Sequence, residues 1–350
     1  MSEPASEPPG GRTVREYYKV PVAQVIRETG DASSLVLDVP PSLAATFAYR
    51  PGQFITVRVP SDQTGSVARC YSLCSSPQAG NLPAITVKRT AGGYASNWIL
   101  DNVTAGLVLD LLPPAGTFTP QSLDGDFLLF AAGSGITPVI SILKSVLAAG
   151  RGRAALVYAN RDERSVIFAA ELRRLVAAAD GRLAVLHWLD SVQGTPAAAG
   201  IAALARPYAG WEPYVCGPDP YLTVVRAALG RLGVPAKRVR AERFLSLAEN
   251  PFEEAPADGG MAATLSVELD GVTRVLPWPP GARMLDVLID AGLEAPHSCR
   301  QGLCGACACQ LLAGQVELAH NEVLEAADLA DGYILACQAV PLTPEVRVTY

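Results

Sequence analysis

The chain of 350 residues, 49% hydrophobic and 18% charged, is long enough for two or three well-packed domains. Its net charge of −6 argues against a nucleic-acid partner, and no apolar run approaches the roughly 18 residues of a membrane span. Residues 1–12 lack the apolar stretch of a signal peptide, and eight cysteines in so long a chain predict a reducing, cytoplasmic location rather than a disulfide scaffold.

After residues 1–16, which are predicted to be disordered, the chain alternates short β-rich runs with turn residues. Six such runs predict an antiparallel β-barrel, which we place at residues 17–118. The runs are Lys19–Arg27, Ser34–Val39, Gln53–Val59, Ala68–Cys74, Ala84–Arg89 and Val108–Leu112.

One predicted strand of the barrel contains Arg69, Tyr71 and Ser72. Alternate residues of a strand share a face, so Arg69 and Tyr71 can place a cation near a phosphate and a ring beside a flat heterocycle. Further along, Ser96 and Asn97 begin a short apolar segment, which predicts a helix whose N-terminus meets a pyrophosphate. Short strands with Tyr-Ser are common, so the combination of these residues indicates a nucleotide site more specifically than any one of them does.

The next part begins with an apolar run at Phe127–Ala132, as expected of a parallel strand that is buried on both faces. The turn Gly133–Gly135 follows at once, and then a helix predicted over Val139–Ala149. Thr137 can cap this helix, and Pro138 suits its first turn. A strand, a glycine turn and a helix N-terminus form a place for a pyrophosphate, although a lone Gly-x-Gly is common by chance.

Strands and helices alternate through residues 119–247, which predicts an α/β doubly wound parallel sheet. Two strand ends carry Asn160-Arg161 and Cys216–Pro218, and dinucleotides bind at the carboxyl ends of such strands. Cys216 taken alone is equally consistent with a buried thiol. The mixed charges of Asn160–Arg164 favour NADH over NADPH, whose 2′-phosphate needs clustered cations. The other predicted elements are the strands Ala154–Tyr158, Leu183–Leu189 and Tyr214–Val215 and the helices Phe168–Ala178 and Tyr221–Leu232.

Residues 248–261, rich in Pro, Ala, Gly and acidic residues, are predicted to be a linker to a last domain at 262–350. There we expect a hairpin that turns at Asp270-Gly271, a helix over Met284–Ala291 and a strand over Tyr333–Cys337. This domain holds eleven Asp and Glu against four Arg, a net charge of −7. The charge favours docking to a basic surface, and an ordinary solvated acidic face explains it equally well.

The last domain contains four cysteines, Cys299, Cys304, Cys307 and Cys337, with the spacing C-x4-C-x2-C-x29-C. This is the spacing of a plant-type [2Fe–2S] cluster, in which two irons need four thiolates. Buried thiols would have no reason to cluster at this spacing, and a zinc site usually needs a second closely spaced pair. Cys309 lies outside the pattern and is predicted to pack in the core.

The Arg-x-Tyr-Ser strand, the run ending in Val-Lys-Arg and Gly-x-x-Ser-Asn together resemble the flavin domain of the ferredoxin–NADP reductase superfamily. The resemblance implies that Arg69 binds the flavin phosphate, Tyr71 packs on the isoalloxazine and Ser72 lies near its N5. It favours FAD over FMN. The residues implied for flavin binding are Arg69, Tyr71, Ser72, Leu73, Val87, Lys88, Arg89, Gly93, Ser96, Asn97 and Thr137.

The glycine turn and Cys-Gly-Pro are similar to the nicotinamide site of this superfamily, in which the Asn-Arg position lies towards the adenosine. Ser72, Thr137 and Cys216 are the implied catalytic residues, because they would surround flavin N5 and nicotinamide C4. The residues implied for NAD binding are Gly133, Gly135, Thr137, Pro138, Asn160, Arg161, Cys216, Gly217 and Pro218.

The order of barrel, doubly wound sheet and plant-type ferredoxin (β-grasp) domain resembles the reductase components of multicomponent oxygenases. The stretches Thr64–Leu73, Gly133–Lys144 and Tyr158–Glu163 most resemble the reductases of 3-ketosteroid 9α-hydroxylases, which act in steroid degradation. The resemblance implies electron transfer from NADH through FAD and a [2Fe–2S] cluster to a Rieske-type oxygenase.

Three alternatives remain open on the sequence. Reductases of phenylacetyl-CoA epoxidases and other aromatic oxygenases share the same domain order. An iron–sulfur binding or sensing protein with a non-catalytic flavin module belongs to another class, and the intact Arg69-x-Tyr71-Ser72 argues against it. A haem-dependent nitric-oxide dioxygenase would need a globin domain, for which the residues before Tyr18 are too few.

Overall fold

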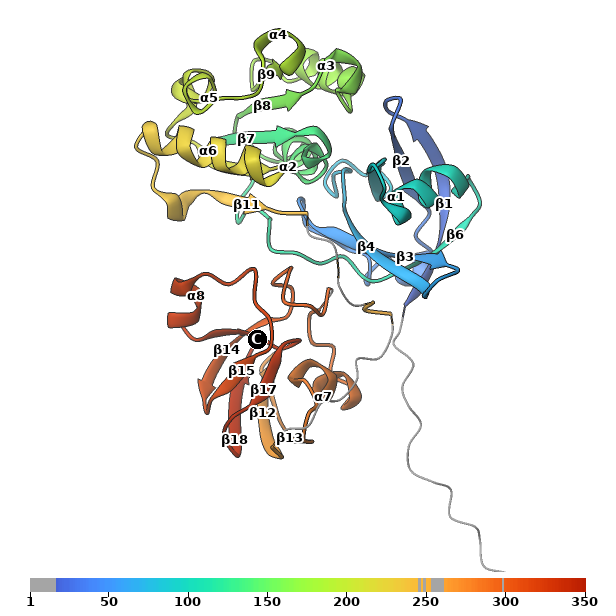
Figure 1. Cartoon of the computed structure of the whole chain (residues 1–350), viewed down its shortest axis with the longest axis vertical. Helices are drawn as coiled ribbons and strands as arrows, with labels where there is room; N and C mark the ends of the chain where they lie inside the picture. Colours follow the sequence, from blue (N-terminus) through green and yellow to red (C-terminus); the bar gives the residue numbers. More distant parts are fainter. Residues whose placement is uncertain (1–16, 245–246, 248–249, 253–260, 298) are drawn as a thin grey trace, which may run out of the picture.

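The computed structural model contains three large β-sheets in succession along the chain, each with its own hydrophobic core (Figure 1). They form a barrel, a doubly wound parallel sheet and a ferredoxin-like C-terminal part, which confirms the predicted fold class. The tail predicted to be disordered, 1–16, and most of the predicted linker lie outside the described residues. The structure describes residues 17–244, 247, 250–252, 261–297 and 299–350.

The six predicted strands of the barrel are all present. They are β1 (Tyr18–Arg27), β2 (Ala32–Leu37), β3 (Phe54–Ser61), β4 (Gly65–Ser72), β5 (Ala84–Lys88) and β6 (Val108–Leu111). The strands are antiparallel in the order β4-β3-β6-β1-β2-β5, and a bridge between Leu73 and Ile85 joins the two ends of the sheet. Alternate side chains, such as Val20 and Val22 in β1, fill the interior.

Helix α1 (Tyr94–Asn102) follows β5, and Gly93 is its N-cap residue. The helix start predicted at Ser96 and Asn97 is therefore wrong, because both residues lie inside the first turn. The Thr90 N–H donates to Ser96 Oγ at 3.0 Å, and Asn97 Nδ2 donates to the Thr90 carbonyl at 3.0 Å. These two side chains hold the preceding loop against the helix.

The doubly wound part has five parallel strands in the order β11-β10-β7-β8-β9. The strands are β7 (Phe127–Ala132), β8 (Ala154–Asn160), β9 (Leu183–Leu189), β10 (Glu212–Cys216) and β11 (Arg240–Glu242). The helices are α2 (Ile136–Ala149), α3 (Ala169–Ala178), α4 (Asp190–Gln193), α5 (Ala198–Ala205) and α6 (Asp219–Arg231). Of these, β11, α4 and α5 are not among the elements predicted from the sequence.

Strand β7 shows why this sheet is covered on both faces. Successive side chains of a strand point to opposite sides. Phe127 and Leu129 pack with α2 and α3, whereas Leu128 and Phe130 pack with α5 and α6. None of the helices formed by the described residues is long and apolar enough to cross a membrane.

The C-terminal part contains the predicted hairpin. Asp270 and Gly271 have φ of 51° and 76°, the left-handed pair that a tight two-residue turn requires. The large sheet has the order β13-β12-β18-β14-β16, and β15 pairs with β17. Its elements are β12 (Ala263–Leu269), β13 (Val272–Trp278), α7 (Met284–Asp290), β14 (Ala308–Ala313), β15 (Val316–Leu318), α8 (Ala326–Ala330), β16 (Tyr333–Leu335), β17 (Ala339–Pro341) and β18 (Glu345–Thr349).

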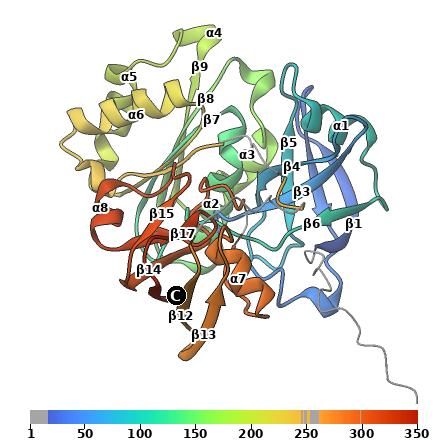
Figure 2. The same cartoon turned by 60° about the horizontal axis from the view of Figure 1, so that its bottom comes forward.

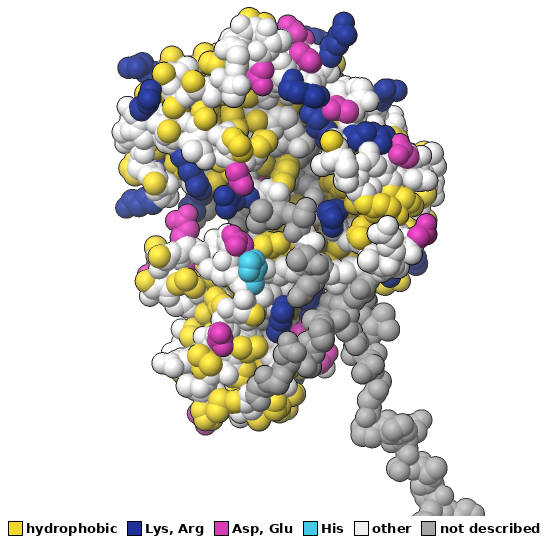
Figure 3. Space-filling model, viewed as in Figure 1, with side chains coloured by type: hydrophobic (Ala, Val, Ile, Leu, Met, Phe, Trp, Pro, Cys, Tyr) yellow, Lys and Arg dark blue, Asp and Glu magenta, His cyan; other side chains and the backbone are white. Residues whose placement is uncertain are grey.

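The barrel and the doubly wound part lie side by side, and the C-terminal part lies across the end of both (Figures 1 and 2). In Figure 3, most Lys and Arg side chains of the visible face lie over the first two parts. This agrees with the net charge of −7 in the sequence of the last part. The arrangement brings the cysteine loop of the C-terminal part against the barrel, where the predicted flavin strand lies.

Candidate functional site

The four predicted thiol ligands lie in two pairs, Cys299 with Cys304 and Cys307 with Cys337. Among the described residues, no three His, Cys, Asp or Glu side chains converge as a single metal ion requires. Two pairs of thiols fit two irons, whereas a zinc site needs its ligands around one ion. Cys309 packs in the core, where burial raises its pKa to about 12. The donor set therefore fits a [2Fe–2S] cluster.

Backbone donors point at the first pair of thiols. The N–H groups of Gln301 and Leu303 both donate to Cys299 Sγ at 3.4 Å. The hydrogen bond from Cys304, together with these N–H groups, lowers the pKa of Cys299 below that of an ordinary thiol. Donors of this kind stabilise a thiolate, which is the form that binds iron.

The cysteine loop is supported by the close backbone approach of Gly302, a glycine that such a loop is expected to need, and by three side chains that no sequence pattern indicates, Arg300, Asp286 and Gln338. Arg300, which is buried and has φ of 60°, forms an ion pair with the half-buried Asp286 of α7. Gln338 Nε2 donates to the Arg300 carbonyl at 2.7 Å. Gly302 has φ of 72°, and a Cβ there would lie 2.4 Å from the His320 carbonyl oxygen, so only glycine fits. Contacts between residues this far apart in sequence leave no local pattern.

On β4, the predicted flavin residues divide between two faces. Ser72 is buried and lines a pocket together with Cys70. Tyr71 packs on the barrel core, and burial raises the pKa of its phenol. Arg69 shares the face of Tyr71, and its guanidinium donates to the Ala68 carbonyl at 2.7 Å. The strand thus offers a cation and a ring on one face and a hydroxyl on the other, which fits a flavin nucleotide.

The three consecutive residues Val87, Lys88 and Arg89, all predicted to bind the flavin, lie in three different environments. Val87 is fully buried in the barrel core. Lys88 reaches the doubly wound part, where its Nζ lies 3.7 Å from the place that a Cβ of Gly133 would occupy. Arg89 forms two hydrogen bonds with the Asp101 carboxylate, at 2.6 and 3.2 Å. Of the three, only Lys88 therefore reaches the glycine turn.

The glycine turn lies against the end of β10. A Cβ on Gly135 would lie only 2.2 Å from the Cys216 carbonyl oxygen, so this approach requires glycine. Gly133 has φ of 53°. The predicted cap at Thr137 is wrong, because α2 begins before it with Gly135 as its N-cap residue. The Thr137 hydroxyl instead donates to the Ser134 carbonyl at 3.0 Å.

Two side chains at the carboxyl ends of β8 and β9, the buried Asn160 and the half-buried Asp190, have buried polar atoms without a hydrogen-bond partner within the described part of the chain. These atoms are both amide atoms of Asn160 and Oδ1 of Asp190. The Tyr158 hydroxyl, which lies close to the Asn160 amide, donates to the Gly133 carbonyl at 3.0 Å. Buried polar groups are nearly always paired, and dinucleotides bind at such strand ends, so the two side chains fit a nucleotide. No pattern in the sequence indicates Asp190 as a site residue.

The remaining predicted nucleotide residues surround this edge of the sheet. Arg161 pairs with Asp31 of the barrel at 3.4 Å, so the two parts are linked here. Pro138 is buried in the first turn of α2, and Pro218 is the N-cap residue of α6. Gly217 continues directly from β10, next to the glycine turn. The structure therefore brings these residues together around the β7–β10 junction and the end of β8.

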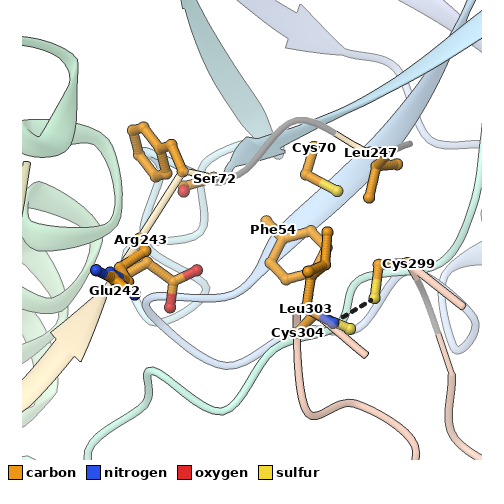
Figure 4. A pocket seen from close by; sticks show the side chains of 10 residues that line it. Phe54, Cys70, Ser72, Glu242, Arg243, Leu247, Cys299, Leu303 and Cys304 are labelled. Atoms are coloured by element: carbon orange, nitrogen blue, oxygen red, sulfur yellow. Dashed lines mark hydrogen bonds between the residues drawn. The ribbon is translucent and has the colours of Figure 1, made fainter. Parts of the chain in front are cut away.

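A pocket between the barrel and the C-terminal part connects the flavin strand with the cysteine loop (Figure 4). Ser72 lies towards one end, and Cys299 and Cys304 lie towards the other. One cavity therefore borders both the predicted flavin hydroxyl and the first thiol pair. Its lining residues are Phe54, Cys70, Ser72, Glu242, Arg243, Phe244, Leu247, Cys299, Leu303 and Cys304.

Glu242, at the end of β11, is a pocket residue that the sequence analysis missed. Burial raises the pKa of its carboxyl to about 8, although part of its surface still faces the pocket. The raised pKa favours the protonated carboxyl, which can donate a hydrogen bond into the pocket that Ser72 also lines. Phe244 lines the same pocket with 49% of its surface exposed, so its ring offers a face to a flat ligand. A strand of three residues is too short for periodicity to reveal.

Three family models match successive parts of the chain. The oxidoreductase FAD-binding domain matches residues 19–119, and the oxidoreductase NAD-binding domain matches residues 129–227. The 2Fe-2S iron-sulfur cluster binding domain matches residues 267–342. These matches confirm the three predicted cofactors and their order along the chain.

Relatives match the chain over nearly its whole length. The ferredoxin reductase component of 3-ketosteroid-9-alpha-monooxygenase from Rhodococcus rhodochrous is 53% identical, covering 94% of this chain and 95% of the relative. A component of the 1,2-phenylacetyl-CoA epoxidase from Escherichia coli (strain K12) is 32% identical, covering 95% and 98%. The solved structure of phthalate dioxygenase reductase, a modular structure for electron transfer from pyridine nucleotides to [2Fe-2S], is 25% identical with a TM-score of 0.56, covering 95% and 98%.

Proposed function

The chain belongs to the family of the ferredoxin reductase components of 3-ketosteroid-9-alpha-monooxygenase, and we propose that it passes electrons from NADH through FAD and a [2Fe–2S] cluster to the oxygenase of such a system. The pocket that borders both Ser72 and Cys304 is the observation that carries this proposal. When bound, FAD accepts two electrons together as hydride and releases them singly. The polypeptide supplies binding, orientation and exclusion of water.

In this proposal, residues 17–118 bind the flavin, 119–247 bind NADH, 248–261 form the linker and 262–350 hold the cluster. The matched ranges 19–119, 129–227 and 267–342 support this division.

The flavin residues act through charge and hydrogen bonds. Arg69 binds a phosphate as a guanidinium does in many proteins, and Tyr71 offers its ring to the isoalloxazine. Ser72 and the protonated Glu242 carboxyl provide hydrogen-bond donors inside the pocket. Phe244 offers its exposed ring to a flat group. These side chains would orient the flavin so that one of its edges faces the cysteine loop.

The nucleotide residues hold NADH against the flavin. The close approach of Gly135 to Cys216 forms a narrow seam between the strand ends, where the backbone can contact a nicotinamide. Asn160 and Asp190 supply buried polar atoms for the rest of the dinucleotide. Such positioning supplies much of the rate of a hydride transfer, because the reacting atoms must lie about 3–3.5 Å apart.

The four cysteines Cys299, Cys304, Cys307 and Cys337 are the proposed cluster ligands. The first pair lines the pocket, so Cys299 and Cys304 would hold the cluster on the side that faces the flavin strand, and the cluster would supply one-electron chemistry there. The second pair lies in the core of the C-terminal part.

The partner is proposed to be a Rieske-type oxygenase that hydroxylates a 3-ketosteroid. The 53% identity to the Rhodococcus reductase supports the steroid system over the epoxidase system, whose matching component is 32% identical. The acidic C-terminal part would meet a basic surface of this partner. We place the protein in the cytoplasm, because its free thiols suit a reducing compartment.

A cysteine variant tests the order of the carriers. In Cys304→Ala, which removes one ligand, we expect electron delivery to the oxygenase to be lost while NADH still reduces the flavin at the unaltered rate. Stopped-flow absorbance separates the two steps. Cys309→Ala is the matched control, because Cys309 is buried nearby but outside the two pairs, and it should keep both steps. Loss of flavin reduction in folded Cys304→Ala would contradict the proposed order.

Reconstitution tests the partner. The reductase is mixed with NADH and either a 3-ketosteroid 9α-hydroxylase oxygenase or a phenylacetyl-CoA epoxidase, and the hydroxylated or epoxidised product is measured. We expect product from the steroid oxygenase alone. Purified protein without a flavin absorption band would instead support the iron–sulfur sensing protein.

A further inference from the structure

Residues 248–261 are predicted to be a linker, yet Asn250 and Phe252 of this stretch contact the barrel. Asn250 Nδ2 donates to the Ser66 carbonyl at 3.1 Å and to Ser66 Oγ at 2.7 Å. Its other amide atom, Oδ1, accepts a hydrogen bond from the Phe252 N–H at 3.1 Å. Asn250 therefore attaches its own segment to β4 and fixes the turn that leads to Phe252.

The Phe252 ring is inserted beside the barrel and is only 9% exposed. It packs edge-on against Tyr17, with ring centroids 6.1 Å apart. The Arg58 guanidinium carbon lies 5.9 Å from the Phe252 ring centroid and 5.4 Å from that of Tyr17. Arg58 Nε also donates to Ser66 Oγ at 3.1 Å, so one arginine of β3 supports both attachments.

The same segment contacts the cysteine loop. Phe252 and Leu247 share a buried apolar cluster with Cys299, and Leu303 and Cys304 pack against it. The barrel contributes its own residues to this cluster, Ala68, Leu112 and Cys70. The attached segment therefore lies in the interface between the barrel and the thiol pair that borders the pocket.

The attachment of Asn250 and Phe252 to the barrel also shortens the stretch of chain that leads to β12 of the C-terminal part. Twenty residues, 243–262, separate β11 from β12, but only ten, 253–262, follow Phe252. The effective concentration of a tethered group falls as about the −3/2 power of the number of residues in the tether, so a tether of twice the length lowers it about threefold. Loss of the apolar contacts that Phe252 makes in the cluster with Cys299 would lower the effective concentration of the C-terminal part at the barrel further.

From these contacts we infer that Asn250 and Phe252 form an anchor that holds the C-terminal part in the position where its cluster receives electrons from the flavin. The inference rests on the proposed function. Both are positioning residues, because neither lines the pocket. Their removal slows the flavin-to-cluster step and leaves the NADH-to-flavin step unchanged.

The test uses Asn250→Ala and Phe252→Ala in the full-length protein with both cofactors bound. After mixing with NADH under anaerobic conditions, flavin and cluster reduction are followed separately by stopped-flow absorbance. We expect cluster reduction to slow roughly threefold to tenfold and flavin reduction to stay within a factor of about two. Phe252→Tyr, which keeps the ring, should restore the rate. Asn102→Ala is the matched control, because Asn102 bonds only within α1 at the surface.

Two results would overturn the anchor. One is cluster reduction at the unaltered rate in both alanine variants, and the other is an equal slowing of flavin and cluster reduction, which indicates a general structural defect. If NADH fails to reduce the cluster of the unaltered protein, the proposed function itself is wrong. The unaltered protein therefore separates that failure from failure of the anchor.

Discussion

The barrel has two interfaces that differ in the buried hydrogen bonds they contain. Helix α2 of the doubly wound part is bound to it by buried polar groups: Ser141 Oγ donates to the Ser75 carbonyl at 2.6 Å, and Lys144 Nζ donates to the Cys74 carbonyl at 2.9 Å. Ser145 adds a hydroxyl contact of 2.8 Å to the same loop. The interface with the cysteine loop is instead an apolar cluster of aliphatic side chains, an aromatic ring and thiols.

This difference agrees with what hydride transfer from NADH to the flavin and electron transfer from the flavin to the cluster each require. Hydride transfer needs two atoms in near contact, so directional hydrogen bonds that fix angle and distance suit the first interface. A single electron passes without the two carriers forming a bond, so a non-directional apolar interface is sufficient for the second. Hydrogen bonds therefore fix orientation at the first interface, and apolar packing holds the parts together at the second.

The largest expected effect on a rate comes from a substitution at Gly135, where the glycine turn closely approaches the Cys216 carbonyl. In Gly135→Ala the new Cβ would lie 2.2 Å from a carbonyl oxygen, so the strand ends must separate. We expect flavin reduction by NADH to fall about 100-fold or more, because small displacements are costly in hydride transfer. Stopped-flow absorbance measures the rate. Gly210→Ala is the matched control, since no atom lies within 4 Å of its new Cβ.

Cluster reduction by dithionite should be unchanged in Gly135→Ala, because the cysteine loop lies at the other interface. A normal rate of flavin reduction by NADH would show that the close approach is dispensable.

An intermediate effect is expected from the buried cation of the polar interface. Lys144 is 11% exposed and also pairs with Glu171 at 2.8 Å. Lys144→Met leaves Glu171 and the Cys74 carbonyl without this partner, so the free energy of unfolding should fall by about 2 kcal/mol in urea denaturation. The matched control is Lys19→Met, whose exposed pair with Asp110 should contribute less than about 1 kcal/mol. Equal losses of unfolding free energy in Lys144→Met and Lys19→Met would show that the interface lysine contributes no more than the exposed one.

The smallest effect concerns pH and Glu242. Its pKa is raised by burial to about 8 in the folded protein, so between the ordinary Glu range and pH 8 the folded state keeps a proton that the unfolded chain has lost. Stability from this group therefore falls as pH rises through that window and levels off above pH 8. Glu242→Gln should flatten this part of the stability–pH curve, measured by urea denaturation. An unchanged slope would mean that the carboxyl is already ionised.

Most of the fold could be predicted because its signals are local. The alternation of the barrel strands, the apolar run of β7 and the turn at Asp270-Gly271 each specify their own structure through nearby residues. The helix starts were less accurate, since Gly93 and Gly135 have no capping side chain and the more visible Ser96 and Thr137 lie inside their helices.

The part of the candidate site that could be predicted is the set of four cysteines, because their spacing along the sequence is itself typical of a [2Fe–2S] cluster. It was not predictable where distant residues meet. Glu242 lies in a strand of three residues, and its significance depends on the pocket that forms around it. The attachment of Asn250 and Phe252 was missed because a sequence rich in Pro, Ala and Gly gives no sign of the side chains it will contact.

The polar face of α2 limits how the length of this helix can vary. Ser141, Lys144 and Ser145 share one face because they are three and four residues apart. Inserting a single residue between Pro138 and Ser141 would rotate that face by about 100° away from the barrel while leaving the glycine turn in place. Among natural relatives, insertions and deletions should therefore be rare in the first half of α2, even where the individual side chains differ.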